Sequence, residues 1–121
     1  DYEGKWCIES FNWHITDWWV KHHPEVVIGQ LYDIYSFQFM PVKLRKQYKT
    51  MDFLAIPVKK PREEYFLPIK KAHPEKMVIM WTVRTLGTFE TAKRLADNII
   101  FECDDKKADN IALEKAKSFL S

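Results

Sequence analysis

The chain has 121 residues, 46% of them hydrophobic, which is enough for one domain with a real core and excludes a disordered chain. Its 19 basic and 17 acidic residues give a net charge of +2, so no charge excess predicts nucleic-acid binding. No apolar run approaches the roughly 20 residues of a transmembrane helix. Residues 1–5 lack the basic start and apolar middle of a signal peptide. We therefore expect no membrane span and favour the cytoplasm.

Two apolar runs in the first third of the chain predict strands, at Lys5–Phe11 and Val26–Leu31. Between them, Trp13–His22 carries its apolar residues at helical spacing. Asn12 is a suitable N-cap, because its side chain can accept from the free N–H groups of the first turn, and Pro24 marks the stop. The first unit is therefore strand, helix, strand.

A second unit follows the same pattern. A loop at Asp33–Met40 leads into a short basic helix at Pro41–Lys49, and Met51–Val58 predicts the third strand. Pro61–Ala72 predicts a helix that Pro68 would kink or interrupt, because proline removes one backbone donor.

Met77–Val83 is almost wholly apolar with no alternation, which is typical of a strand buried on both faces of a parallel sheet. Thr88 is expected to cap the helix that follows. The apolar face of that helix is expected to comprise Ala92, Leu95, Ala96 and Ile99. A short strand-like run at Ile99–Phe101 and a last helix at Asn110–Leu120 complete the chain.

The alternation of strands and helices, with strand starts roughly 20–26 residues apart, predicts parallel β/α units and an α/β fold. A closed barrel of eight such units typically needs ~250 residues. We therefore expect residues 1–121 to form a single domain resembling half of a TIM (β/α)8 barrel, with four β/α units.

Two segments resemble glycerophosphodiester phosphodiesterases. Lys5–Leu31, with Glu-Ser-Phe-Asn after its first apolar run, is similar to the fifth strand, fifth helix and sixth strand of that family. Met77–Glu102 is similar to its eighth strand and helix, through Trp-Thr-Val-Arg at residues 81–84 and Ala-Asp-Asn-Ile-Ile at residues 96–100.

The resemblance implies metal-dependent hydrolysis of glycerophosphodiesters to glycerol 3-phosphate and an alcohol, with a divalent cation (Mg or Ca) and two histidines as general base and acid. The family's His-Arg-Gly motif, Glu-x-Asp metal ligands and second catalytic histidine belong to the N-terminal half of its barrel, and this sequence contains none of them. The resemblance thus implies a C-terminal portion that has no catalytic residue or metal ligand of its own and is inactive in isolation. Its expected partner is the N-terminal half of the barrel or, in a homo-oligomer, another copy of the chain.

Ligands of parallel α/β barrels meet the carboxyl ends of the strands. Three residues at such ends are candidates for substrate binding: Glu9, Phe11 and Trp81. The indole of Trp81 either walls a glycerol-sized pocket or fills the top layer of the barrel. Glu9 lies in an apolar strand, where an unpaired carboxylate is costly, so it is either metal-proximal or hydrogen-bonded, or else faces the surface or a salt-bridge partner.

The remaining conspicuous residues receive structural interpretations. Cys7 and Cys103 are expected to be buried thiols, because two cysteines are too few for a disulfide framework. His22 and His23 are expected at a solvated helix end, because adjacent helical residues point in different directions. Three tryptophans are expected to pack against the sheet: Trp13, Trp18 and Trp19.

Two other functions remain open. Leu86–Asp97 resembles the strand-to-helix junction of plant AP2 DNA-binding domains, which pack a three-stranded antiparallel sheet on one helix. That domain needs Arg and Trp in the strands before the helix, whereas Met77–Val83 is almost wholly apolar. The other alternative is a non-catalytic half-barrel that serves as a binding or assembly module.

Overall fold

The computed structural model describes residues 2–33, 46, 49–59, 61, 63–102, 114, 117 and 118, without the side chains of 65, 66 and 69. Five strands form one sheet. They are β1 (Cys7–Ser10), β2 (Val27–Leu31), β3 (Phe53–Pro57), β4 (Met77–Val83) and β5 (Asn98–Phe101). The connecting helices are α1 (Trp13–His22), α3 (Glu63–Ala72) and α4 (Leu86–Leu95). No helix in the described part of the chain has the length and apolar character needed to cross a membrane.

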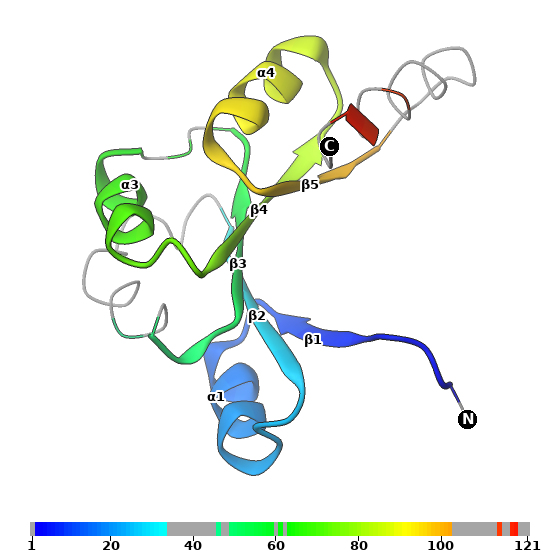
Figure 1. Ribbon diagram of the computed structural model, residues 1–121, viewed down its shortest axis with the longest axis vertical. Helices are drawn as coiled ribbons and strands as arrows, with labels where there is room; N and C mark the ends of the chain where they lie inside the picture. Colours follow the sequence, from blue (N-terminus) through cyan, green and yellow to red (C-terminus); the bar gives the residue numbers. More distant parts are fainter. Residues whose placement is uncertain are drawn as a thin grey trace.

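The strands lie in the sheet in the order in which they occur in the chain, and every adjacent pair is parallel. Successive right-handed crossovers without a reversal of strand order place their helices on one face of a sheet. Figure 1 shows α1, α3 and α4 on one side, while β1 and β5 at the two edges turn toward the other. The predicted α/β class with parallel units is confirmed. The AP2-like alternative, by contrast, implies an antiparallel sheet.

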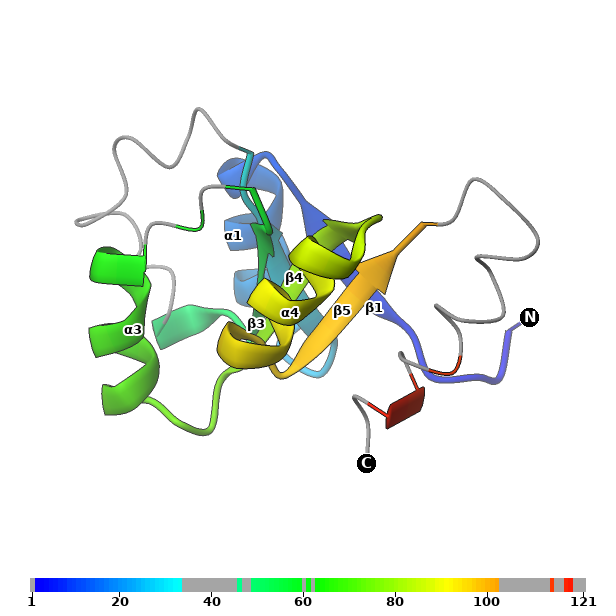
Figure 2. The same ribbon diagram turned by 90° about the horizontal axis from the view of Figure 1, so that it is seen from above.

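The hydrophobic core lies between the sheet and the helices. Alternate strand residues face it: Ile28 in β2, Leu54 and Ile56 in β3, Val78 and Met80 in β4, each at most 2% exposed. The helix α4 contributes Phe89, Ala92 and Leu95 from a single stripe, and it lies over β4 and β5 (Figure 2). The opposite face of the sheet has none of the described helices on it.

Helix boundaries follow local capping chemistry. The Oδ1 atom of Asn12 accepts from the backbone N–H of His14 at 3.0 Å, so the predicted cap of α1 is confirmed. The predicted cap of α4 is wrong by one turn, because Thr85 and not Thr88 is the N-cap. The Thr85 hydroxyl accepts from the Thr88 N–H at 3.2 Å, and the Thr88 hydroxyl accepts from the Thr85 N–H at 3.1 Å. This reciprocal capping box uses threonine at N3 where Glu or Gln is usual.

Other boundaries also differ from the sequence-based predictions. The first strand is shorter than Lys5–Phe11, because in the described sheet β1 pairs only with β2, from Cys7 to Ser10. The helix α3 continues through Pro68. Ile99 belongs to β5 and not to the face of α4, so the strand-like run predicted at Ile99–Phe101 is a fifth strand beside those of the four predicted β/α units. Within the two helices predicted at residues 41–49 and 110–120, the described residues are helical: Lys46, Lys49, Glu114, Lys117 and Ser118. The rest of both helices, most of the Asp33–Met40 loop and Cys103 lie outside the described residues.

The same pair of reciprocal hydrogen bonds joins the amino ends of neighbouring strands at two places. The Ile28 N–H donates to Oδ2 of Asp52 at 2.9 Å, and the Asp52 N–H donates back to the Ile28 carbonyl at 2.8 Å. Val78 and Asp97 repeat both bonds, each at 2.8 Å. Each aspartate directly precedes a strand and fixes its register against the preceding strand. These bonds stabilise the amino edge of the sheet. Because ligands of parallel α/β barrels bind at the carboxyl ends of the strands, we look for the functional site at that edge.

Candidate functional site at the carboxyl edge

The candidate site occupies the face of the sheet opposite the helices. Strand side chains alternate, so Phe53 and Ala55 point to this face while their neighbours Leu54 and Ile56 enter the core. Gly29 has no side chain on this face, and a Cβ atom added to it would overlap the Phe53 ring. Three residues of this face are exposed apolar side chains: Val27 at 48%, Met77 at 45% and Ile100 at 41%.

Phe11 and Trp81 meet at the carboxyl edge of this face. Their ring centroids are 5.7 Å apart and the rings are edge to face at 75°, a preferred aromatic geometry. Trp81 lies in β4, whereas Phe11 directly follows β1. Three strand spacings separate β1 from β4, which amounts to about 14 Å in a flat sheet. The contact therefore requires the sheet to curve around its helix-free face.

The indole of Trp81 has an unsatisfied donor. Its Nε1 atom is buried and has no hydrogen-bond partner among the described residues. An unpaired buried N–H typically costs about 1–3 kcal/mol, because its bond to water is lost without replacement. The residue is only partly buried as a whole, and its neighbour Phe11 is 54% exposed. An oxygen of a bound ligand would satisfy this N–H.

Gln30 positions the segment that carries Phe11, a role that the sequence did not reveal. Its amide nitrogen donates to the carbonyls of Ser10 at 2.8 Å and Phe11 at 3.1 Å. Its amide oxygen accepts from the hydroxyl of Thr16 at 2.6 Å. Both side chains are at most 2% exposed. The one available signal was a polar residue inside the second apolar run of the sequence.

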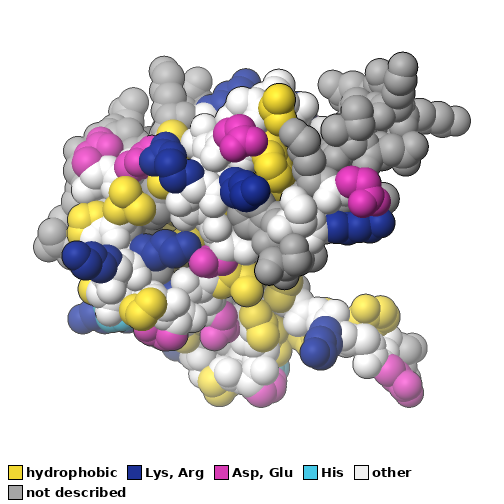
Figure 3. Space-filling model, turned by 45° about the horizontal axis from the view of Figure 1, so that its top comes forward, with side chains coloured by type: hydrophobic (Ala, Val, Ile, Leu, Met, Phe, Trp, Pro, Cys, Tyr) yellow, Lys and Arg dark blue, Asp and Glu magenta, His cyan; other side chains and the backbone are white. Residues whose placement is uncertain are grey.

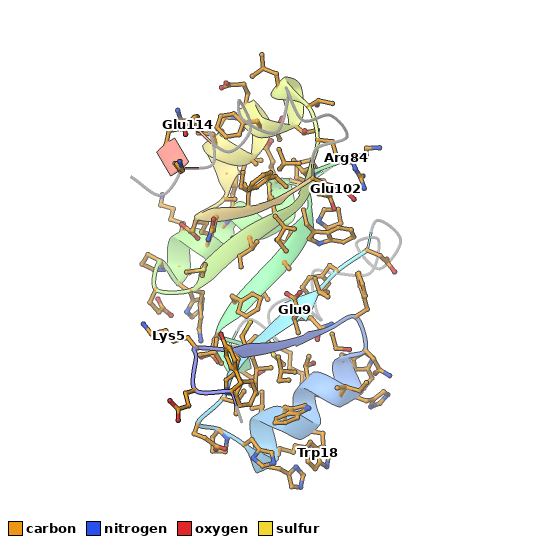
Figure 4. All side chains as sticks on the ribbon, turned by 90° about the vertical axis from the view of Figure 1, so that its right-hand side faces the viewer. Lys5, Glu9, Trp18, Arg84, Glu102 and Glu114 are labelled. Carbon is orange, nitrogen blue, oxygen red and sulfur yellow. The ribbon has the colours of Figure 1, made fainter. Side chains whose placement is uncertain are left out.

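Glu9 is exposed and lies on the side of β1 turned away from α1 (Figure 4). It makes no ion pair or hydrogen bond with the described part of the chain, so the structure agrees with the surface-facing alternative that the sequence left open. Cys7 lies two residues earlier on the same strand and is also exposed, which corrects the prediction of a buried thiol. Partial burial of the sulfur, and then the charge of Glu9, raise the pKa of the Cys7 thiol above its ordinary value.

Arg84 and Glu102 form an ion pair at the same edge, directly after β4 and β5. The Nε of Arg84 donates to Oε2 of Glu102 at 2.8 Å, and the terminal Nη2 contacts the same oxygen. The two side chains point toward each other (Figure 4) and are about half exposed. Sequence reasoning did not single out this pair, although both residues directly follow apolar runs.

The histidines do not assemble into a metal site. His22 is exposed and donates through Nδ1 to the Trp18 carbonyl at 2.8 Å, while the Nδ1 of His23 lies 3.1 Å from Oε1 of Glu25. Among the described residues there is no group of three or more His, Cys, Asp or Glu that could hold a metal ion. In the described structure, Glu9 is the carboxylate on the helix-free face near the aromatic pair.

Comparisons with protein-family models, with curated proteins and with solved structures found no match to this chain. What the site does is therefore argued from its own residues. Two of the three predicted substrate-binding residues, Phe11 and Trp81, are in contact, and Glu9 lies on the same face.

Proposed function

We propose that this chain is the C-terminal portion of a metal-dependent glycerophosphodiester phosphodiesterase, which hydrolyses glycerophosphodiesters to glycerol 3-phosphate and an alcohol. The resemblance of Lys5–Leu31 and Met77–Glu102 to that family supports the proposal, as does a parallel sheet in sequential strand order with one helix-free face. That order is the one found in TIM barrels.

The contact between Phe11 and Trp81 carries the proposal, because it brings together residues of β4 and of the segment after β1 across β2 and β3, as the curvature of a barrel would. A barrel of eight strands built on β1 to β5 needs three more strands. Each strand then lies one place earlier than the resemblance implied, with β1 fourth instead of fifth and β4 seventh instead of eighth, because β5 continues the sheet beyond β4. The three missing strands would close the barrel between the open edges of β1 and β5.

The three predicted substrate-binding residues each have a role in this proposal. The ring of Trp81 lies against the glycerol carbons, and its unpaired Nε1–H donates to a substrate oxygen. Phe11 supports that ring and excludes water from one side. The Glu9 carboxylate accepts a hydrogen bond from a glycerol hydroxyl or lies close to the metal.

The divalent cation, Mg or Ca, does not fit the described residues alone. Such ions take six or more oxygen ligands from several groups, whereas one carboxylate lies beside the aromatic pair. We therefore assign the metal ligands and both catalytic histidines to the complementary part of the barrel, and we expect the 121 residues alone to be inactive.

The proposal is tested by joining the chain to a phosphodiesterase N-terminal segment that carries His-Arg-Gly and Glu-x-Asp, and by measuring glycerophosphocholine hydrolysis with Mg²⁺ or Ca²⁺. We expect turnover by the joined protein and none by the chain alone. Turnover by the chain alone, or a folded joined protein without activity, would contradict the proposal. Binding of glycerol 3-phosphate without turnover would instead identify the chain as a non-catalytic half-barrel module.

A further inference from the structure

Helix α1 exposes an unusual surface. Over its ten residues, three large apolar side chains are exposed: Trp13 at 42%, Ile15 at 46% and Trp18 at 49%. The exposed residues of α4 include three charged side chains, Glu90, Lys93 and Arg94, and one large apolar side chain, Leu86. Figure 3 shows the face around α4 as an intermixed surface of basic and acidic side chains. The expected packing of Trp13 and Trp18 against the sheet is therefore wrong, whereas Trp19 does pack against the core.

Trp18 points directly away from the sheet. At about 100° per residue it lies roughly 160° around the helix from both Thr16 and Val20, which face inward. Figure 4 shows Trp18 on the side of α1 far from the strands. New strands added at the edge of β1 would lie beside the sheet and leave this outward face uncovered, so closure of a barrel does not explain the exposed indole.

The indole of Trp18 is held in place rather than free. It stacks on the His22 ring with centroids 4.5 Å apart and an interplanar angle of 17°, and it meets Trp19 edge to face at 5.6 Å. The same His22 donates through Nδ1 to the Trp18 carbonyl. A side chain fixed in this way loses little conformational entropy on binding.

We propose that this outer patch, made of His14, Ile15, Trp18, Lys21 and His22, docks the protein on a phospholipid surface. Tryptophan favours the membrane–water interface, because its ring is apolar and its N–H can bond to headgroups. Lys21 is the charged residue among these five and its ammonium group complements headgroup phosphates, while Asp17 borders the patch on the same helix. The helix lies flat on the surface, with Ile15 and Trp18 inserted. This inference is independent of the proposed phosphodiesterase function.

The test is flotation of the 121-residue chain with vesicles of phosphatidylcholine, alone or mixed with phosphatidylglycerol. We expect binding to both, with tighter binding to the anionic vesicles. Trp18→Ser should lower the partition coefficient about tenfold, on the scale of burying part of one large side chain. Trp18→Tyr should retain most of the binding, and Lys21→Gln should remove the preference for anionic vesicles. Leu86→Ser is the matched control, because Leu86 is 59% exposed on α4 and should not contribute.

Two results would overturn the inference. The first is a wild-type chain that does not float with either vesicle. The second is a Trp18→Ser variant that floats as well as the wild type. If the sedimentation coefficient of that variant also differs from the wild-type value, the patch binds protein instead. Circular dichroism of each variant verifies that the fold is intact, and no hydrolysis is measured, so failure here leaves the phosphodiesterase proposal unaffected.

Discussion

The rings of Phe11 and Trp81 touch edge to face, with centroids 5.7 Å apart, although β2 and β3 lie between the strands that carry them. This contact closes the carboxyl edge of the sheet over its helix-free face. Gln30 supports it from the other side by holding the carbonyls of Ser10 and Phe11. A buried amide on the helix side thus positions an aromatic residue on the opposite side.

The bare Gly29 allows the Phe53 ring to lie flat on the sheet, so we expect Gly29→Ala to destabilise the fold. The added Cβ would overlap that ring, and overpacking of this kind typically costs about 1–3 kcal/mol. Chemical denaturation should show a lower midpoint, and adding Phe53→Leu should restore part of the loss. An unchanged midpoint would mean that the ring is free to move aside. Gly87→Ala is the control, because a Cβ at Gly87 would lie 4.0 Å from the Thr85 hydroxyl oxygen, an ordinary contact distance.

The sequence predicts the sheet well because its strands are apolar runs, and the central strand β3 is buried along its whole length. Met77–Val83 was predicted with the observed bounds, and α1 likewise. The errors fall where a side chain has two competing roles. In Thr-Leu-Gly-Thr, either Thr85 or Thr88 can cap a helix, and the choice depends on where the chain leaves β4.

Asp97 should be one of the more sensitive charged residues of the described chain. It accepts from the Val78 N–H at 2.8 Å and from Lys70 Nζ at 2.9 Å. Asp97→Ala leaves a partly buried N–H without a partner, so we expect a loss of about 1–3 kcal/mol in the free energy of unfolding. Asp97→Asn keeps an acceptor and should lose less. Glu90→Ala, at an exposed position of α4, should stay within about 0.5 kcal/mol of wild type. Equal losses in Asp97→Ala and Glu90→Ala would show that the hydrogen bonds between Asp97 and Val78 do not stabilise the fold.

The Cys7 thiol should react slowly for an exposed cysteine. Its pKa is raised by partial burial and by the charge of Glu9, so less thiolate is present at a given pH. The pH midpoint of its alkylation rate should lie above that of an unperturbed cysteine, and Glu9→Gln should move it downward. Peptide-resolved mass spectrometry separates Cys7 from Cys103. A midpoint unchanged by Glu9→Gln would show that the two side chains do not share a face.

The chain should associate through its open edges. Within the described sheet, β1 pairs only with β2 and β5 only with β4, and Val27, Met77 and Ile100 expose apolar surface on the helix-free face. Unpaired strand edges beside apolar side chains favour pairing with another chain. Analytical ultracentrifugation at micromolar concentration should detect a dimer or larger species, which Ile100→Lys should weaken and Leu86→Lys should not. A stable wild-type monomer would contradict this.

The candidate site is harder to predict than the fold. Position at the carboxyl end of a strand was enough to select Glu9, Phe11 and Trp81, but not to show that two of them touch, because contact depends on sheet curvature. Exposure was misjudged for Cys7, since an apolar run does not reveal that its strand is at an edge. The Arg84–Glu102 pair joins residues 18 positions apart and has no local signal.

Trp81→Ala distinguishes a substrate-binding residue from a packing residue. In the joined protein, loss of the ring and of its Nε1–H donor should raise the barrier to hydrolysis by roughly 1–3 kcal/mol, on the scale of one large side chain. If Trp81 only fills the top layer, the same change should cost ~3–5 kcal/mol of stability and leave activity per folded molecule unchanged. The denaturation midpoint and kcat/KM for glycerophosphocholine are measured on the same variant. Met77→Ala, at the other end of β4 and 45% exposed, serves as the control. A loss of activity that follows the loss of folded protein alone would remove Trp81 from the site.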